Sequence, residues 1–336
     1  MYWPTRQGHR MRRRKLLGIL TASAIAAPFC ARAQPTGGGP VRIGYLASNG
    51  KDSETTVAFL QGLHERGFNE DRNFELTLID YTTSGRSLAE AAAALVAAKP
   101  ALVVADGPEA VLRALREHSA TVPAVVVAVN YDPVARGYAA SLAHPGGNVT
   151  GVYFQSLEVV GKQLELLREL APGERRVAVL WGAETADEFA AAGVAAKNLG
   201  LELRGVKLGD PPYDLEAVFR ALAEDAPKMV LVLSTPYFVP HRPQIAALAL
   251  QYRLPAMFRF RSYAAVGGLM SFGVDSPAMR RRAAVYVAQI LKGAKVADLP
   301  IERADRFQLV INAKTADQLG VVLPGSLRAR ADEVIE

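Results

Sequence analysis

Polar and charged residues recur directly after short apolar runs of this chain, and their types suit the binding of a small molecule. They are Ser48, Asn49, Asp106, Gly107, Asn130, Asp132, Trp181, Glu184, Ser234, Thr235 and Arg259. Hydroxyls, amides, carboxylates and an aromatic ring would together fit a small polar ligand with an apolar side. The same residue types also cap helices and form turns, so each one alone has a structural interpretation. The set is therefore stronger evidence for a binding site than any of its members.

The runs that precede these residues are rich in Val, Ile and Leu and alternate with helical stretches. The predicted strands are 41–47, 74–80, 101–105, 124–129, 176–181, 201–206, 229–233 and 256–258. The predicted helices are 53–66, 86–98, 108–117, 157–170, 186–199, 215–223 and 244–251. Alternation of this kind predicts parallel sheets with helices on both faces.

The pattern runs twice, on either side of a Gly-rich segment at residues 145–151. We therefore predict an α/β protein of two Rossmann-like lobes with parallel sheets, joined by a hinge at that segment. Lobe 1 is predicted at 40–152 and completed by about 276–305, and lobe 2 at 153–275 and completed by about 306–336. The alternative is that 145–151 is a surface loop within one large sheet. Ligands of open α/β sheets collect beyond the carboxyl ends of the strands, which is where the polar residues lie.

The first 33 residues have the pattern of an export signal. A basic cluster at 12–15 precedes an apolar run at 16–29, and small residues surround Ala33, where we expect cleavage. The pair Arg13 and Arg14 fits a twin-arginine signal, and the Sec route stays open. Met11 is an alternative start to Met1. A membrane anchor is disfavoured because the run is shorter than the ~20 residues that span a bilayer. The mature protein is expected in the periplasm.

Cleavage changes the composition that matters for function. The Lys/Arg count falls from 39 to 32, against 33 Asp/Glu, so the net charge of +6 becomes −1. A mature surface near neutrality gives no support to nucleic-acid binding. Cys30 is the single cysteine of the chain and lies within the signal. Without a thiol, the mature protein should have no disulfide, no cysteine-ligated metal site and no cysteine nucleophile. No pairing of its histidines suggests another metal site, and we expect no cofactor.

The sequence also disfavours an enzyme, and we expect no catalytic residues. It has no Gly-x-Ser-x-Gly elbow, no His-Glu-x-x-His pair and no phosphate-binding Gly-x-x-x-x-Gly-Lys loop. Asp132 and Glu184 could be imagined as the two carboxylates of a glycosidase, which is the one catalytic alternative.

Several segments, in order from about residue 41 to the end of the chain, carry a family resemblance. They include 42–46, 132–134, 141–151, 161–167, 267–273, 290–294, 298–302, 310–316 and 331–336. In these segments the chain resembles solute-binding proteins of ABC importers of the tryptophan/tyrosine-import type, which have a type I periplasmic-binding fold. The run Pro-Gly-Gly-Asn-Val-Thr-Gly at 145–151 is the most specific of them.

The resemblance implies a cleft that closes on a small molecule and a partner permease in the membrane. In such proteins loop hydroxyls and N–H groups take the carboxylate of an aromatic amino acid, a carboxylate or amide takes its ammonium, and rings pack on its side chain. Carried over by position, this adds Gln155 to the residues already named and supports Ser48, Asn49, Gly107, Asn130, Asp132, Glu184, Ser234 and Thr235.

Asp106 departs from the family pattern, in which a small hydroxyl or amide residue is commoner. An anion there would repel a ligand carboxylate or pair with an ammonium. Arg259 and Arg261 are alternative carboxylate ligands, although alternating Arg-Phe-Arg favours solvated faces of a short strand. The predicted function is capture of a small polar molecule, such as an amino acid or an aromatic or carboxylate compound, by a monomer that delivers it to an ABC importer. The alternative is a stand-alone sensor that presents its ligand to a receptor or kinase.

Overall fold

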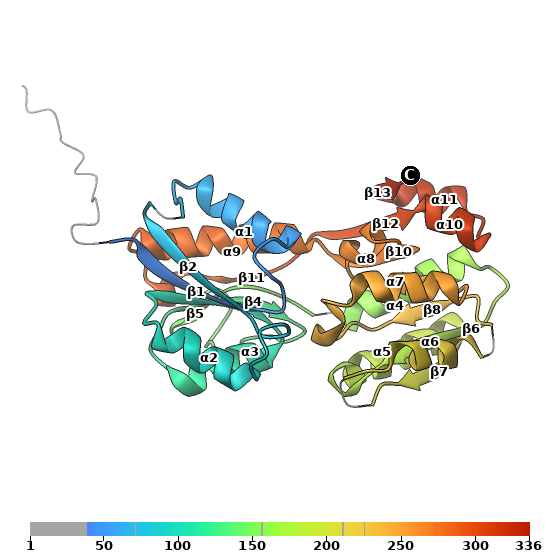
Figure 1. Ribbon diagram of the computed structural model, residues 1–336, viewed down its shortest axis with the longest axis horizontal. Coiled ribbons are helices and arrows are strands. Elements are labelled where there is room, and N and C mark those ends of the chain that lie inside the picture. Colours follow the sequence, from blue (N-terminus) through green and yellow to red (C-terminus); the bar gives the residue numbers. More distant parts are fainter. Residues whose placement is uncertain (1–38, 71, 156, 210–211, 225) are drawn as a thin grey trace, which may run out of the picture. The chain divides into compact units, whose positions relative to one another are not determined.

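The computed structural model describes residues 39–70, 72–155, 157–209, 212–224 and 226–336. These residues form two β-sheets, each covered by helices on both faces (Figure 1). The predicted export signal at 1–33 lies outside the described residues. Across the described ranges, no helix has both the length and the apolar character needed to cross a bilayer.

The first sheet has six strands in the order β11-β5-β4-β3-β1-β2. Its strands are β1 (Val41–Ala47), β2 (Phe74–Asp80), β3 (Leu102–Gly107), β4 (Ala124–Val129), β5 (Val149–Phe154) and β11 (Ile301–Arg303). All of its neighbouring strands pair in parallel. We call this sheet and its helices lobe 1.

The second sheet has seven strands in the order β13-β12-β10-β9-β8-β6-β7. Its strands are β6 (Arg176–Trp181), β7 (Glu202–Lys207), β8 (Val230–Val232), β9 (Ala256–Phe258), β10 (Met270–Val274), β12 (Phe307–Asn312) and β13 (Glu333–Ile335). The β10–β12 pair is antiparallel and the other pairs are parallel. The α/β class with two mostly parallel sheets is thereby confirmed. We call this sheet and its helices lobe 2.

Strands buried on both faces explain why lobe 1 needs helices on each side. In β1, Ile43 and Tyr45 pack into one apolar cluster and Leu46 into the other. The first cluster includes side chains of α1 (Glu54–His64) and α9 (Ser276–Leu291), and the second those of α2 (Leu88–Ala97) and α3 (Glu109–His118). Because successive side chains point to opposite faces of a sheet, a continuous apolar run indicates a strand that is covered by helices on both faces.

Lobe 2 repeats this arrangement with its own helices. They are α4 (Leu157–Leu170), α5 (Ala186–Leu199), α6 (Leu215–Ala223), α7 (Arg242–Gln251), α8 (Arg261–Ala265), α10 (Ala313–Leu319) and α11 (Gly325–Arg330). Short 3-10 turns lie at η1 (Ala183–Thr185) and η2 (Pro236–Phe238) in lobe 2, and η3 (Val296–Asp298) lies against β5 in lobe 1. Two apolar clusters flank the second sheet, one with Leu164 and Ala192 of α4 and α5, the other with Phe219 and Ile245 of α6 and α7.

The chain passes between the lobes after β5, after β10 and after β11. The prediction of a hinge at 145–151 is therefore wrong, because Val149 to Gly151 belong to β5 inside lobe 1. Gly151 has φ +134°, and a Cβ atom there would lie 2.2 Å from the carbonyl oxygen of Val126 on the neighbouring strand. Its glycine serves the close approach of β5 to β4 and not the flexing of a hinge.

We predict that Gly151→Ala lowers the free energy of unfolding by about 1–3 kcal/mol or more, because the added methyl must displace backbone in a packed sheet. Gly161→Ala is the matched control. That glycine lies within α4, where the nearest atom to a new Cβ is 3.7 Å away. Alanine should there raise stability by about 0.5–1 kcal/mol. Urea titrations of both variants measure the change in unfolding free energy. Equal changes in the two variants would contradict the close approach of β5 to β4 at Gly151.

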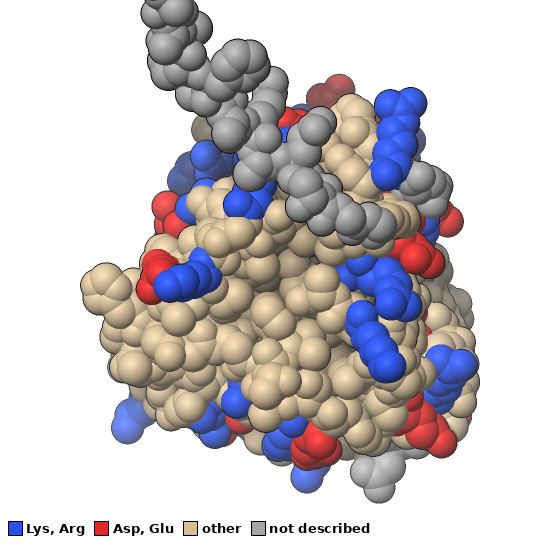
Figure 2. Space-filling model, turned by 90° about the vertical axis from the view of Figure 1, so that its left-hand side faces the viewer, with Lys and Arg blue, Asp and Glu red and all other residues tan. Residues whose placement is uncertain are grey.

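Figure 2 shows the end of lobe 1 that faces away from lobe 2. Among the described residues on this face, Lys and Arg are scattered among Asp and Glu around a broad uncharged area, and they do not gather in one basic patch.

Candidate functional site

A cavity of about 460 Å³ lies at the carboxyl ends of the strands and takes its walls from both lobes. Its size falls in the range typical of small-molecule pockets. Nine of the predicted residues line it: Ser48, Asn49, Asp106, Gly107, Asn130, Glu184, Ser234, Thr235 and Arg259. They come together because parallel strands end at one edge of each sheet and the loops after them share that edge.

Asp132, Gln155 and Trp181 lie outside the lining of this cavity. One oxygen of Asp132 accepts hydrogen bonds from the backbone N–H groups of Val134 and Ala135, at 2.8 and 3.2 Å, and so holds a turn. The Trp181 ring stacks on Phe189 with 4.5 Å between ring centroids. Gln155 is half-buried just after β5.

Asp106 is buried in an ion pair with Arg280, a residue that is not among the predicted site residues. The Arg280 Nε and Nη2 atoms donate to the two carboxylate oxygens at 3.0 and 2.5 Å, and the Tyr45 hydroxyl donates to the same carboxylate at 2.7 Å. The side chains of Asp106 and Arg280 are 3% and 7% exposed. Burial lowers the pKa of Arg280, but Asp106 and Tyr45 outweigh this and hold its pKa above the ordinary value. Burial and the nearby carboxylate raise the pKa of Tyr45.

This pairing changes what Asp106 offers to a ligand. Its two oxygens already accept three hydrogen bonds, and its charge is balanced by a bidentate guanidinium. The lobe 1 wall of the cavity therefore presents a neutral Asp106–Arg280 ion pair in place of a single negative charge. No local pattern in the sequence links Asp106 to Arg280, because α9 returns to lobe 1 from far along the chain.

Arg259 is also buried, at 3% exposure, which contradicts the interpretation that it lies on a solvated strand face. The strand β9 ends at Phe258, and Arg259 turns into the interior, where its Nη2 donates to Glu188 of α5. Glu188 accepts a second hydrogen bond from the Asn130 amide of lobe 1, at 2.5 Å. Buried Arg259 and Glu188 and half-buried Asn130 thus form a network that joins the two lobes. Arg261, in contrast, is partly exposed and pairs with Glu333 at 2.6 Å.

Two buried hydroxyls that line the cavity have no hydrogen-bond partner among the described residues, Tyr131 and Thr235. Burial raises the pKa of Tyr131. Burial also raises the pKa of Tyr263 to about 12, while its hydroxyl lies 3.2 Å from that of Ser234. A buried polar group without a partner is costly. Both hydroxyl oxygens are enclosed in the wall of the cavity, so a bound molecule would reach them only after a local rearrangement.

Helix ends add donors on the lobe 1 side. Pro108, the N-cap residue of α3, provides no capping side chain, and Glu109 and Ala110 of its first turn line the cavity. Such N–H groups favour an anionic or carbonyl oxygen. Ser53 caps α1 by accepting from the N–H of Thr56 at 3.2 Å.

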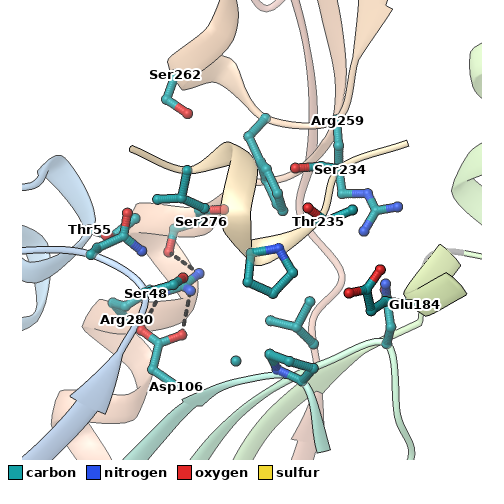
Figure 3. A pocket seen from close by; sticks show the side chains of 18 of the residues that line it. Ser48, Thr55, Asp106, Glu184, Ser234, Thr235, Arg259, Ser262, Ser276 and Arg280 are labelled. Carbon is teal, nitrogen blue, oxygen red and sulfur yellow. Dashed lines mark hydrogen bonds and ion pairs between the residues drawn. The ribbon is translucent and has the colours of Figure 1, made fainter. Parts of the chain in front are cut away.

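Figure 3 shows that the polar side chains form two groups across the cavity. Ser48, Thr55, Ser276, Asp106 and Arg280 lie on the lobe 1 side. Ser234, Thr235, Arg259 and Glu184 lie on the lobe 2 side, with the Glu184 carboxylate directed into the space between. A molecule that fills the cavity would touch both lobes. Over the described ranges, no three His, Cys, Asp or Glu side chains are grouped so that they could hold a metal ion.

The family model of the ABC transporter substrate binding proteins matches residues 47–335 of this chain. The chain belongs to this family. The family consists of substrate-binding proteins that work with ABC permeases and are not enzymes, and its members are typically extracytoplasmic.

Individual relatives of this substrate-binding protein agree with the assignment. A tyrosine-binding protein of Clostridioides difficile is 23% identical over 287 residues, which are 83% of this chain and 80% of that protein. A solved structure of a conserved domain protein from Vibrio cholerae is 25% identical, with a TM-score of 0.75, and covers 88% of this chain and 99% of that one. An ABC domain from Streptococcus pneumoniae in complex with L-Trp has the same TM-score and coverage of 88% and 100%, at 22% identity. The predicted family resemblance is confirmed.

Proposed function

We propose that this protein captures a small zwitterionic or carboxylate-bearing solute, of which an amino acid is the leading class, and delivers it to an ABC importer in the membrane. The observation that carries the proposal is the 460 Å³ cavity whose polar walls come from both lobes. The names of the relatives, one a tyrosine-binding protein and one a complex with L-Trp, support the amino-acid class.

Because residues of both lobes line the cavity, a bound ligand would act on the relative position of the lobes. A ligand that contacts both lobes binds the closed form more tightly than the open form and shifts the population toward closure. The hydrogen bond between Asn130 of lobe 1 and Glu188 of lobe 2 joins the lobes and so favours closure even without a ligand. A permease could then distinguish the loaded form by the relative position of the lobes.

The proposed location is the periplasm, after cleavage of the segment 1–33 near Ala33. The basic cluster, the apolar run and the small residues before Gln34 support export by the twin-arginine or the Sec route. N-terminal sequencing of the protein from the periplasmic fraction tests both the location and the cleavage site.

The first test of function is calorimetric titration of purified residues 34–336, unfolded and refolded to remove carried-over ligand. The panel contains the twenty amino acids, aromatic acids and other small carboxylates. We expect saturable 1:1 binding of one compound class with Kd near 1 µM or below, which corresponds to about 8 kcal/mol of binding free energy. The absence of binding across the panel would count against amino-acid import.

We also predict that the ligand found in this way compacts the protein. Small-angle X-ray scattering should show a smaller radius of gyration at saturation, because closure brings the lobes together. A compound that binds without compaction would contradict capture between the lobes. Glycine at millimolar concentration, if calorimetry shows no binding, serves as the control for nonspecific effects.

A further inference from the structure

The dipeptide Asn49–Gly50, in the loop between β1 and α1, combines two residues that react with each other. Asn49 is the one asparagine of the chain that is followed by glycine. Asparagine is thermolabile because the backbone nitrogen of the next residue can attack its side-chain amide. Glycine favours this attack, since it has no side chain in the way and its backbone is the most flexible. Asn49 also lines the cavity, so a reaction there would alter the cavity wall.

The folded loop leaves this dipeptide open to the reaction. Asn49 is half-buried and Gly50 is exposed. Over the described ranges, neither the Asn49 amide nor the Gly50 N–H makes a hydrogen bond. A Cβ atom added to Gly50 would meet nothing within 4 Å, so no neighbouring group crowds this residue. A loop with so few contacts opens locally at a low cost in free energy, and the side chain can then reach the backbone nitrogen.

A second dipeptide of related composition, Asp106–Gly107, is protected in the same cavity wall. It is the one Asp–Gly pair of the chain, and aspartate forms the same cyclic imide by loss of water. Its carboxylate is 3% exposed and accepts three hydrogen bonds. Gly107 belongs to β3 and is paired with β4. The two dipeptides therefore differ in how they are held, and only Asn49–Gly50 is expected to react.

We propose that Asn49 deamidates spontaneously in the folded protein, with water as the co-reactant. The backbone nitrogen of Gly50 loses its proton and bonds to Cγ of Asn49, and the side-chain nitrogen leaves as ammonia. The succinimide that results then takes up water. Opening of its bond to Cγ gives aspartate. Opening of its bond to the backbone carbonyl carbon gives isoaspartate, whose main chain is longer by one methylene group.

Both products change the chemistry of the cavity wall. A neutral amide, which donates and accepts hydrogen bonds, becomes a carboxylate that accepts and carries a negative charge. The Asp106–Arg280 pair of the same wall is already neutral, so it does not offset the new charge. A solute that places its own carboxylate near residue 49 should bind about tenfold more weakly. This consequence for binding rests on the proposed function, whereas the deamidation itself does not.

The experiment follows one peptide by mass spectrometry. Purified residues 34–336 are incubated at physiological temperature in mildly alkaline buffer, where the attacking nitrogen loses its proton more readily, and are digested with trypsin at intervals. Cleavage after Arg42 and Lys51 releases the peptide 43–51, in which Asn49 is the one side-chain amide. We expect two new forms of this peptide, both with the mass of the acid in place of the amide. One of them should accept a methyl group from an isoaspartyl methyltransferase.

Gly50→Ala separates this chemistry from the fold. The φ of Gly50 lies outside the left-handed region and its Cβ position is open, so alanine should fit without strain. The methyl group hinders the attack and should slow the deamidation by about tenfold or more. The melting temperature should stay at the wild-type value. Asn198 is the internal control, because it is exposed at the end of α5 but is followed by Leu199, and it should stay unmodified.

Two results would overturn the deamidation. The peptide 43–51 could stay unmodified in the folded protein while it reacts in the urea-unfolded protein, which would mean that the loop protects Asn49. Alternatively, Gly50→Ala could react as fast as the wild type, which would mean that the nitrogen of Gly50 does not control the reaction.

Asn49→Asp tests the consequence for binding, because it contains one of the two products from the start. It should bind the carboxylate-bearing ligand found by calorimetry about tenfold more weakly than the wild type. Unchanged affinity would overturn the effect on the solute and leave the deamidation standing. If no compound of the panel binds the wild type, the proposed function and the effect on binding fail together, while the mass of the peptide 43–51 still decides whether Asn49 deamidates.

Discussion

Arg280→Met is expected to lower the free energy of unfolding by about 3–5 kcal/mol, because it leaves the carboxylate of Asp106 buried without a partner charge. Asp106 is 3% exposed, and water cannot replace the two N–H donors that the substitution removes. Methionine fills the space of the aliphatic stem, so lost packing contributes little. Equilibrium unfolding in urea measures the change.

Arg282→Met is the matched control, two residues further along α9. Arg282 pairs with Glu302, but the two side chains are 44% and 37% exposed. An exposed ion pair contributes about 0–1 kcal/mol, so this variant should stay near wild-type stability. The double variant Asp106→Asn with Arg280→Met removes both charges and keeps an acceptor for the Tyr45 hydroxyl. It should be more stable than Arg280→Met alone, and a double variant that is less stable would contradict the cost of the unpaired carboxylate.

Glu188→Gln is expected to cost a similar amount, about 3–5 kcal/mol, because Arg259 then stays buried without a counter-charge. The two side chains are 4% and 3% exposed. Glutamine keeps an oxygen that can accept a hydrogen bond from the Asn130 amide. The loss of unfolding free energy should therefore come chiefly from the broken ion pair with Arg259. Thermal and urea unfolding of the ligand-free protein measure it.

The neighbouring residue provides the control for this prediction. Asp187 precedes Glu188 on α5 but is exposed, and Asp187→Asn should change stability by less than about 0.5 kcal/mol. If Glu188→Gln were equally mild, the network that joins Asn130, Glu188 and Arg259 would not be a stabilising element. A mild effect would also weaken the view that it favours the closed form.

Most of the fold could be predicted from local patterns. The strands at 41–47, 74–80, 124–129, 176–181 and 256–258 agree with β1, β2, β4, β6 and β9 residue for residue. Strand β5, part of which was assigned to the hinge, and strands β10 to β13 were not predicted. Strands β11 and β13 have only three residues each, which is too short for an alternation of apolar and polar residues to be recognised. Strands β10 and β12 are stabilised as strands by pairing with each other, across more than thirty positions of the sequence.

The candidate site divides in the same way between sequence and structure. The sequence alone determined that polar residues such as Ser48 and Thr235 end the strands of two α/β lobes, because strand periodicity and the common edge of a parallel sheet are local or topological properties. Only the tertiary structure decided which charges neutralise one another. Arg280 reaches Asp106 and Glu188 reaches Arg259 across 174 and 71 positions. The energy of a charge pair depends on the distance between the charged atoms and on their burial. Neither quantity can be read from the periodicity of the sequence.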